Sequence, residues 1–116
     1  MPTRVLIADD AAPIRAIKRQ ILAKAPEVEV VGEAADATEA IRLAEALRPH
    51  LIVMDLRMPG DGPTATKHIR KVHPVAKILA VTAFADKGVV EALKGQYQVD
   101  ALLSKDQIVH ELIPTI

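Results

Sequence analysis

The sequence predicts a doubly wound α/β domain, in which helices cover both faces of a parallel sheet. Short apolar segments, typical of strands buried on both faces, recur along the 116 residues. Segments with helical spacing of apolar residues lie between them, and proline or glycine marks most boundaries. Strands that alternate with helices form parallel sheets with right-handed crossovers, so this fold class follows.

Five segments are expected to be strands. The central one, residues 51–55, has four consecutive apolar residues, then Asp55, and then a Met-Pro-Gly sequence that cannot continue a strand. The other four cover residues 5–8, 28–31, 78–81 and 101–103, and the second of these is expected to end at Gly32.

Five segments are expected to be helices. Pro13 suits the first turn of the first helix, which Pro26 is expected to close. Lys18 and three other basic residues surround its apolar positions, and a solvated helix face is the simplest interpretation of them. Asp36 and Glu39 resemble a capping box at the start of the second helix, which ends before Pro49. The remaining helices are expected within residues 64–72, 87–93 and 108–113.

Composition narrows the class of protein. One domain is the default for this length, and the hydrophobic fraction of 50% is ample for an aliphatic core. Fifteen basic and fifteen acidic residues give no net charge, which argues against binding to nucleic acid or an anionic membrane. There is no cysteine, no visible signal peptide and no apolar segment long enough to span a bilayer. We therefore expect a soluble, cytoplasmic domain.

Polar side chains follow four of the expected strands at the point where each strand ends. Asp9 and Asp10 follow the first, Asp55 the third, Thr82 the fourth and Lys105 the fifth. The carboxyl ends of parallel strands meet at one edge of the sheet, so these residues should converge. Crowded carboxylates need a bound cation or a raised pKa, and oxygen ligands without histidine or cysteine suit Mg²⁺. Asp55 could then accept a phosphoryl group as an acyl phosphate, with Thr82 and Lys105 contacting its oxygens.

Each of these residues has an ordinary structural explanation when it is taken alone. An Asp-Asp pair at a helix start is more often a cap than a ligand pair. A threonine that ends a strand is usually structural, and a lysine after a strand usually marks the surface. It is their joint position at the ends of different strands that favours a shared site.

The segments VLIADD (5–10), MDLRMPG (54–60), VTA (81–83) and LSKD (103–106) resemble the receiver domain of two-component response regulators. VGEAAD (31–36) and RPHLIVMD (48–55) are most similar to receivers of LuxR/NarL-type regulators. The resemblance covers nearly the whole chain and implies one receiver domain over residues 1–116. It also implies a flavodoxin-like five-stranded sheet of order 2-1-3-4-5 with five helices.

The resemblance assigns a role to each matching residue. Asp55 is the implied phosphoacceptor, and Thr82 and Lys105 would hold the phosphoryl group. Asp10, Asp55 and the carbonyl group of Arg57 are the implied Mg²⁺ ligands, and Asp9 would orient waters on the metal. The implied donor is a phosphohistidine on a sensor histidine kinase or a phosphotransfer protein, and a homodimer is a further implied partner. Such a domain catalyses only its own phosphorylation and dephosphorylation.

The sequence departs from the family pattern at three places. Leu102 stands where the family often has a tyrosine or phenylalanine that couples to the threonine. The loop after Asp55 is one residue shorter than the common form, while the segment 96–99 is longer and the last helix shorter. The first departure concerns the output step, and the last concerns the surface formed by the fourth expected helix, the fifth strand and the fifth helix. Phe84, two residues after Thr82, occupies a position that tunes dephosphorylation in the family.

Other enzyme and binding classes fit less well. A haloacid-dehalogenase-like phosphatase needs a second aspartate where Arg57 stands. A dinucleotide-binding turn needs glycines after the first strand, and residues 60–67 lack the glycine that a P-loop has before its lysine. The four histidines do not have metal-ligand spacing.

Two functions remain open within the receiver interpretation. The chain is either the input domain of a transcriptional regulator or a stand-alone receiver that acts by protein contact or relays phosphate. In neither case does this domain itself bind nucleic acid or a membrane. The residues encoded beyond Ile116 would distinguish the two.

Overall fold

The fold is described from a computed structural model, in which residues 2–55, 62–73, 75–82 and 99–104 are described. Their elements follow the order β1, α1, β2, α2, β3, α3, β4, β5. The strands are Thr3–Ala8, Val28–Ala34, Leu51–Asp55, Lys77–Thr82 and Ala101–Ser104, and the helices are Ala12–Leu22, Ala37–Leu47 and Gly62–Val72.

The strands form one parallel sheet in the order β2-β1-β3-β4-β5, which is the order predicted from the sequence. β1 and β3 are neighbours, with Ala8 opposite Met54 at their carboxyl ends. The register between β1 and β2 shifts by one residue between Val5 and Leu6. Every strand therefore ends at the same edge of the sheet, which we call the carboxyl edge.

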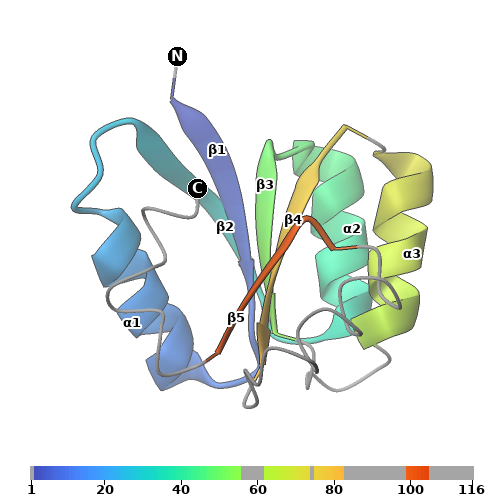
Figure 1. Ribbon diagram of the computed structural model, residues 1–116, viewed down its shortest axis with the longest axis horizontal. Helices are drawn as coiled ribbons and strands as arrows, with labels where there is room; N and C mark the ends of the chain where they lie inside the picture. Colours follow the sequence, from blue (N-terminus) through green and yellow to red (C-terminus); the bar gives the residue numbers. More distant parts are fainter. Residues whose placement is uncertain (1, 56–61, 74, 83–98, 105–116) are drawn as a thin grey trace.

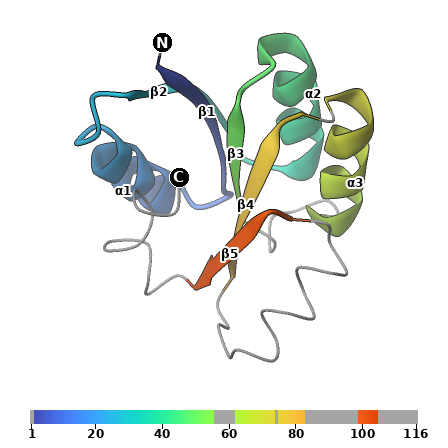
Figure 2. The ribbon, with the colours of Figure 1, turned by 45° about the horizontal axis from the view of Figure 1, so that its top comes forward.

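Helices lie on both faces of the sheet, with α1 on one face and α2 and α3 together on the other (Figures 1 and 2). Three helices lie within the described residues, and they cover both faces of the parallel sheet as in a doubly wound, flavodoxin-like fold. The expected helices at 87–93 and 108–113 lie outside the described residues, and five helices stay a prediction.

The two faces of the sheet carry separate aliphatic clusters, because successive residues of a strand point to opposite faces. Leu6, Ile52 and Ile78 belong to the cluster on the α2 and α3 side. Val5 and Val53 belong to the other cluster, with Leu22 of α1. Both clusters consist of aliphatic residues and Met54, since Phe84 and Tyr97 lie outside the described ranges.

The helix boundaries follow local chemistry. Pro13 occupies the first turn of α1, where its missing N–H group is tolerated. The carboxylate of Asp36 caps α2 by accepting a hydrogen bond from the N–H group of Glu39 at 2.8 Å. The Glu39 side chain accepts from the N–H of Ala35 at 3.3 Å, one residue before the position of an ideal capping box. α2 ends at Leu47, and Arg48 follows it in the left-handed conformation with φ of 46°.

Several predicted boundaries were wrong: β1 begins at Thr3 rather than Val5, α3 begins at Gly62 rather than Thr64, and the ends of β2 and α1 also differ. β2 does not end at Gly32 but continues to Ala34. A Cβ atom at position 32 would lie 2.9 Å from Cδ1 of Leu47, so any larger residue there requires the end of that side chain to shift. α1 ends at Leu22 rather than at Pro26, because the N–H groups of Lys24 and Ala25 bond to carbonyl groups three residues earlier, at 3.2 and 3.0 Å, as in turns, instead of four residues earlier as in an α-helix.

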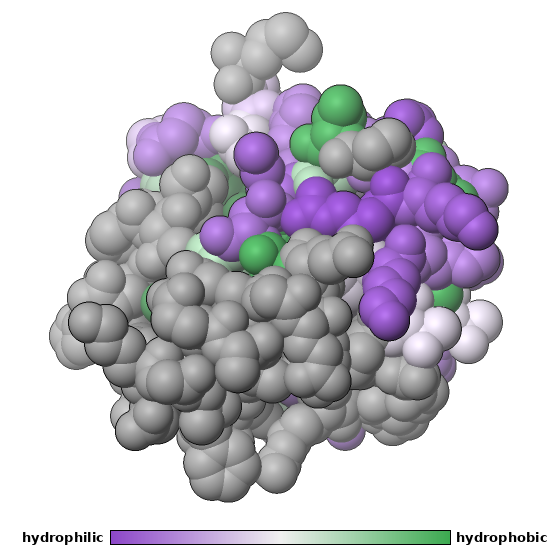
Figure 3. Space-filling view, turned by 45° about the vertical axis from the view of Figure 1, so that its right-hand side comes forward, coloured by the Kyte–Doolittle hydropathy of each residue, from purple (hydrophilic) through white to green (hydrophobic). Residues whose placement is uncertain are grey.

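The described surface is mainly polar. In the face shown in Figure 3, hydrophilic residues cover most of the described area and hydrophobic residues form small separate spots. The exposed large apolar side chains among the described residues are Ile17 and Val75. Among these same residues, no helix is long and apolar enough to cross a bilayer.

Candidate functional site at the carboxyl edge

Three aspartates meet at the carboxyl edge of the sheet. Asp9 and Asp10 directly follow β1, and Asp55 is the last residue of β3. One carboxylate oxygen from each lies within 4.8 Å of those of the other two. Asp9 and Asp55 are fully buried, and Asp10 is exposed. The predicted convergence of these three acids is therefore found.

Strand pairing explains this convergence. β1 and β3 are hydrogen-bonded neighbours, and Ala8 and Met54 are register partners. The next residue of each chain segment is an aspartate, so Asp9 and Asp55 come together although they are distant in sequence. Asp9 also continues the alternation of Val5 and Ile7, whose side chains face α1. Its backbone N–H group remains tied to the sheet by a 2.9 Å bond to the carbonyl oxygen of Ala34.

The Asp9 carboxylate is held on both oxygens. Its Oδ1 atom accepts a hydrogen bond from the N–H group of Ala11 at 2.9 Å. Its Oδ2 atom lies 2.7 Å from Nζ of Lys18, and both side chains have an exposed fraction of 0%. Its carbonyl oxygen accepts a bond from Nη1 of Arg15 at 2.6 Å. Asp9 is thus fixed in position by α1 and by the loop that begins it.

The burial of Lys18 contradicts the prediction that the basic residues of α1 form a solvated face. Lys18 is four residues after Ile14 and three or four before Ile21 and Leu22, so it lies on the inward face of the helix. A buried ammonium group there is compatible with folding because the buried Asp9 carboxylate pairs with it. The helical spacing of Lys18 relative to these apolar residues was the signal that could have predicted its burial.

Of the two neighbouring arginines of α1, Arg19 follows the prediction of a solvated face, whereas the Arg15 side chain is only 19% exposed. Arg19 is 57% exposed at its side chain and lies 2.6 Å from the Glu33 carboxylate of β2. Arg15 contacts the same carboxylate at 3.3 Å. These partly exposed pairs tie α1 to the edge of the sheet at small energetic gain.

The donor set of the three aspartates suits a hard cation. Carboxylate oxygens are the ligands that Mg²⁺ and Ca²⁺ prefer, and soft ligands are absent from this group. Three carboxylates at this separation repel one another, and a bound divalent cation would offset that repulsion. The cluster therefore could hold a metal ion.

The other predicted site residues are only partly covered by the structure. Thr82 is the last residue of β4 and pairs with Ser104 of β5, which places its backbone at the carboxyl edge. Leu102 lies in β5 opposite Ala80. Arg57, Phe84 and Lys105 lie outside the described residues.

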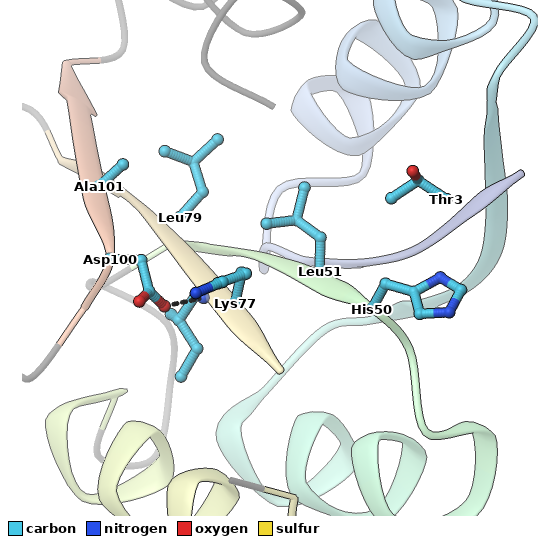
Figure 4. A pocket seen from close by; sticks show the side chains of 8 residues that line it. Thr3, His50, Leu51, Lys77, Leu79, Asp100 and Ala101 are labelled. Atoms are coloured by element: carbon cyan, nitrogen blue, oxygen red, sulfur yellow. Dashed lines mark hydrogen bonds between the residues drawn. The ribbon is translucent and has the colours of Figure 1, made fainter. Parts of the chain in front are cut away.

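A cavity of about 450 Å³ that the sequence did not reveal opens at the opposite edge of the sheet (Figure 4). Four of its lining residues are the first residues of their strands, and Asp100 immediately precedes β5. It is lined by Thr3, His50, Leu51, Lys77, Ile78, Leu79, Asp100 and Ala101. Because parallel strands all start at that edge, the cavity lies away from the three aspartates.

Residues 5–116 match the family described as the response regulator receiver domain. The transcriptional regulatory protein PdtaR of Mycobacterium tuberculosis is 39% identical over 117 residues, which is 100% of this chain and 56% of PdtaR. The chemotaxis protein CheY of Thermotoga maritima is 42% identical over 96 residues, which is 81% of this chain and 79% of CheY. The chain thus spans about half of PdtaR, and it spans about a quarter of the protein-glutamate methylesterases that it also matches.

Solved structures agree with this assignment. The LuxR-family two-component response regulator from Aurantimonas sp. SI85-9A1 superposes with a TM-score of 0.87 and 34% identity, over 98% of this chain and 81% of that one. The strand order, the acid cluster and the family match point the same way. The chain belongs to the receiver domains of two-component response regulators.

Proposed function

We propose that residues 1–116 act as one phosphorylation-dependent switch, in which Asp55 accepts a phosphoryl group from a sensor histidine kinase or a phosphotransfer protein. The observation that supports this most directly is the position of Asp55. It ends the central strand, and its carboxylate lies within 4.8 Å of those of Asp9 and Asp10. The family match supports the donor class, because receiver domains belong to two-component systems.

In the proposed reaction, a carboxylate oxygen of Asp55 forms a bond to phosphorus while the bond between phosphorus and the donor histidine nitrogen breaks. The product is an acyl phosphate, and the electron pair stays on the imidazole. Asp10, Asp55 and the carbonyl group of Arg57 would hold Mg²⁺, and Asp9 would orient its waters. The metal would neutralise charge on the transferring phosphoryl group. Thr82 and Lys105 would contact the phosphoryl oxygens.

Asp55 is suited to this role because the sheet fixes it. Its strand is hydrogen-bonded to a neighbour on each side, β1 and β4, and all five of its residues are buried. A nucleophile held in this way keeps its orientation towards a donor, which lowers the entropy lost in reaching the transition state. Exposure of the adjacent Asp10 leaves the cluster reachable from solvent.

Phosphorylation of Asp55 is tested by incubating the domain with acetyl phosphate and Mg²⁺ and measuring the intact mass. We expect the wild-type protein to gain the mass of one phosphoryl group and Asp55→Asn to gain none. Asp100→Asn, which makes the same chemical change at the opposite edge of the sheet, should still gain it. An adduct of equal yield in Asp55→Asn would refute the assignment. Phosphotransfer from a panel of the host's histidine kinases, also measured by mass, would then identify the donor.

For the output, we propose the input domain of a transcriptional regulator. The similarity to PdtaR and to a LuxR-family regulator supports this role. The domain's zero net charge argues that DNA would be bound by another part of such a protein. A stand-alone receiver is the second candidate, because the chain matches CheY over 79% of that protein's length. The coding sequence after Ile116 distinguishes them, since the first role requires a further domain there.

A further inference from the structure

Lys18 has an unusual position for a lysine. It is the largest side chain among the described residues that are fully buried, and it projects from α1 into the same side of the sheet as Val5 and Val53. Burial of an ammonium group is costly unless a buried anion pairs with it. Its partner is Asp9, with 2.7 Å between Nζ and Oδ2 and no exposure of either side chain. The pair therefore couples α1 directly to the acid cluster.

The pair also changes the charge of that cluster. Asp9, Asp10 and Asp55 bring three carboxylates together, and the Lys18 ammonium group offsets one of them. Both Asp9 oxygens already accept a hydrogen bond, one from Lys18 and one from the N–H group of Ala11. A cation that coordinated Asp9 directly would have to compete with these donors.

We propose that Lys18 is a positioning residue that tunes the cation site. It holds the Asp9 carboxylate in place and acts as a tethered positive charge, so that it lowers the affinity of the cluster for Mg²⁺. This inference rests on the proposed function, because it takes the three aspartates as the Mg²⁺ site. In the metal-free protein, the same ammonium group relieves part of the repulsion between the carboxylates, which allows the cluster to form without a bound ion.

The primary test is calorimetric titration of the domain with MgCl₂. Lys18→Gln removes the charge and retains an N–H donor for Asp9. Because a unit charge a few ångströms from a divalent ion strongly affects its binding, we expect Lys18→Gln to bind Mg²⁺ roughly tenfold more tightly than wild type. Lys24→Met, which removes an exposed charge just after the same helix, should leave the dissociation constant unchanged. Equal dissociation constants for Lys18→Gln and wild type would overturn the proposal, as would an equal gain in Lys24→Met.

A second variant keeps the test decisive if Lys18→Gln does not fold. The double variant Asp9→Asn with Lys18→Met replaces the ion pair by neutral side chains and leaves the net charge of the cluster as in wild type. We therefore expect its Mg²⁺ dissociation constant to be within about threefold of the wild-type value. If Lys18 had only a structural role, the double variant would show the effect of losing the Asp9 charge alone. It would then bind Mg²⁺ about tenfold more weakly than wild type, and this result would refute the proposal.

The wild-type titration separates this inference from the proposed function. Wild-type protein that takes up no Mg²⁺ would contradict the metal site itself. A different result would contradict only the role of Lys18. In that result the wild-type protein binds Mg²⁺ and is phosphorylated on Asp55, but the Lys18→Gln variant binds Mg²⁺ with the same affinity as wild type.

Discussion

The carboxylate of Asp100 accepts a hydrogen bond from the backbone N–H group of Ile78 at 2.7 Å, and thereby connects the start of β5 to the start of β4 (Figure 4). Arg70 of α3 forms an ion pair with the same carboxylate. Partial burial by itself would raise the pKa of Asp100. The hydrogen bond from Ile78 and the contact with Arg70 outweigh it, so the pKa lies below its ordinary value.

This lowered pKa predicts acid-dependent stability. The ionised Asp100 carboxylate favours the folded state, so its contribution is complete above the unfolded-state pKa of about 3.9 and is lost as the pH falls through the lower folded-state value. We expect Asp100→Asn to unfold at lower urea concentration than wild type at pH 7, with the difference shrinking below pH ~4. Urea titrations at several pH values measure this. A constant difference down to pH ~2.5 would contradict it, and Glu45→Gln, an exposed change on α2, serves as the control.

A second prediction concerns the cap of α2. Asp36→Ala removes the oxygen that accepts the Glu39 N–H group, and this should lower the free energy of unfolding by about 1 kcal/mol. Asp36→Asn should retain most of the stability, because asparagine caps nearly as well. Urea denaturation followed by circular dichroism gives both values. Equal stability of Asp36→Ala and wild type would show that the cap contributes nothing.

A third prediction concerns the contact between β2 and α2. Gly32→Ala brings a Cβ atom to 2.9 Å from Cδ1 of Leu47, so the leucine must shift. We expect a loss of roughly 1–3 kcal/mol, as for other overpacked sites. Leu47→Ala removes the atom in conflict, so the double variant should lose less than the sum of the two single losses. Additive losses in this double-mutant cycle would place the cost elsewhere.

A fourth prediction concerns metal binding and depends on the proposed function. Millimolar Mg²⁺ should raise the melting temperature of the wild-type protein, because it relieves repulsion among the three aspartates. Asp10→Asn should weaken the binding and so reduce this rise, because it removes a charged oxygen ligand. Thermal unfolding with and without MgCl₂ measures it. Equal melting temperatures of the wild-type protein in both buffers would count against the site.

Much of the architecture was predictable because its signals are local. The apolar segment that ends at Asp55 has the length and composition of a doubly buried strand, and Asp36 with Glu39 marks the start of α2. Parallel topology places Asp9, Asp10 and Asp55 at one edge of the sheet, and the pairing of β1 with β3 brings them together.

The errors arose where a distant contact overrides the local signal. Gly32 resembles a strand end, but β2 continues past it because residues 32–34 pair with Leu6, Ile7 and Ala8 of β1. Helical spacing places Lys18 on the inward face of α1, but its charge favours the surface, and its burial depends on a carboxylate nine positions earlier in the chain. Neither partner can be identified from the neighbouring sequence, because one depends on how two strands pair and the other on how a helix packs on the sheet.

The pairing of β1 with β3 has a consequence for dynamics. Asp9 and Asp55 directly follow the register partners Ala8 and Met54, in the two strands that lie second and third in the sheet. A divalent ion bound by both acids would link the ends of β1 and β3. These two strands can separate only when the middle of the sheet opens. Amide hydrogens of these two strands should then exchange with deuterium more slowly when the ion is added, while those near the outer strands change less.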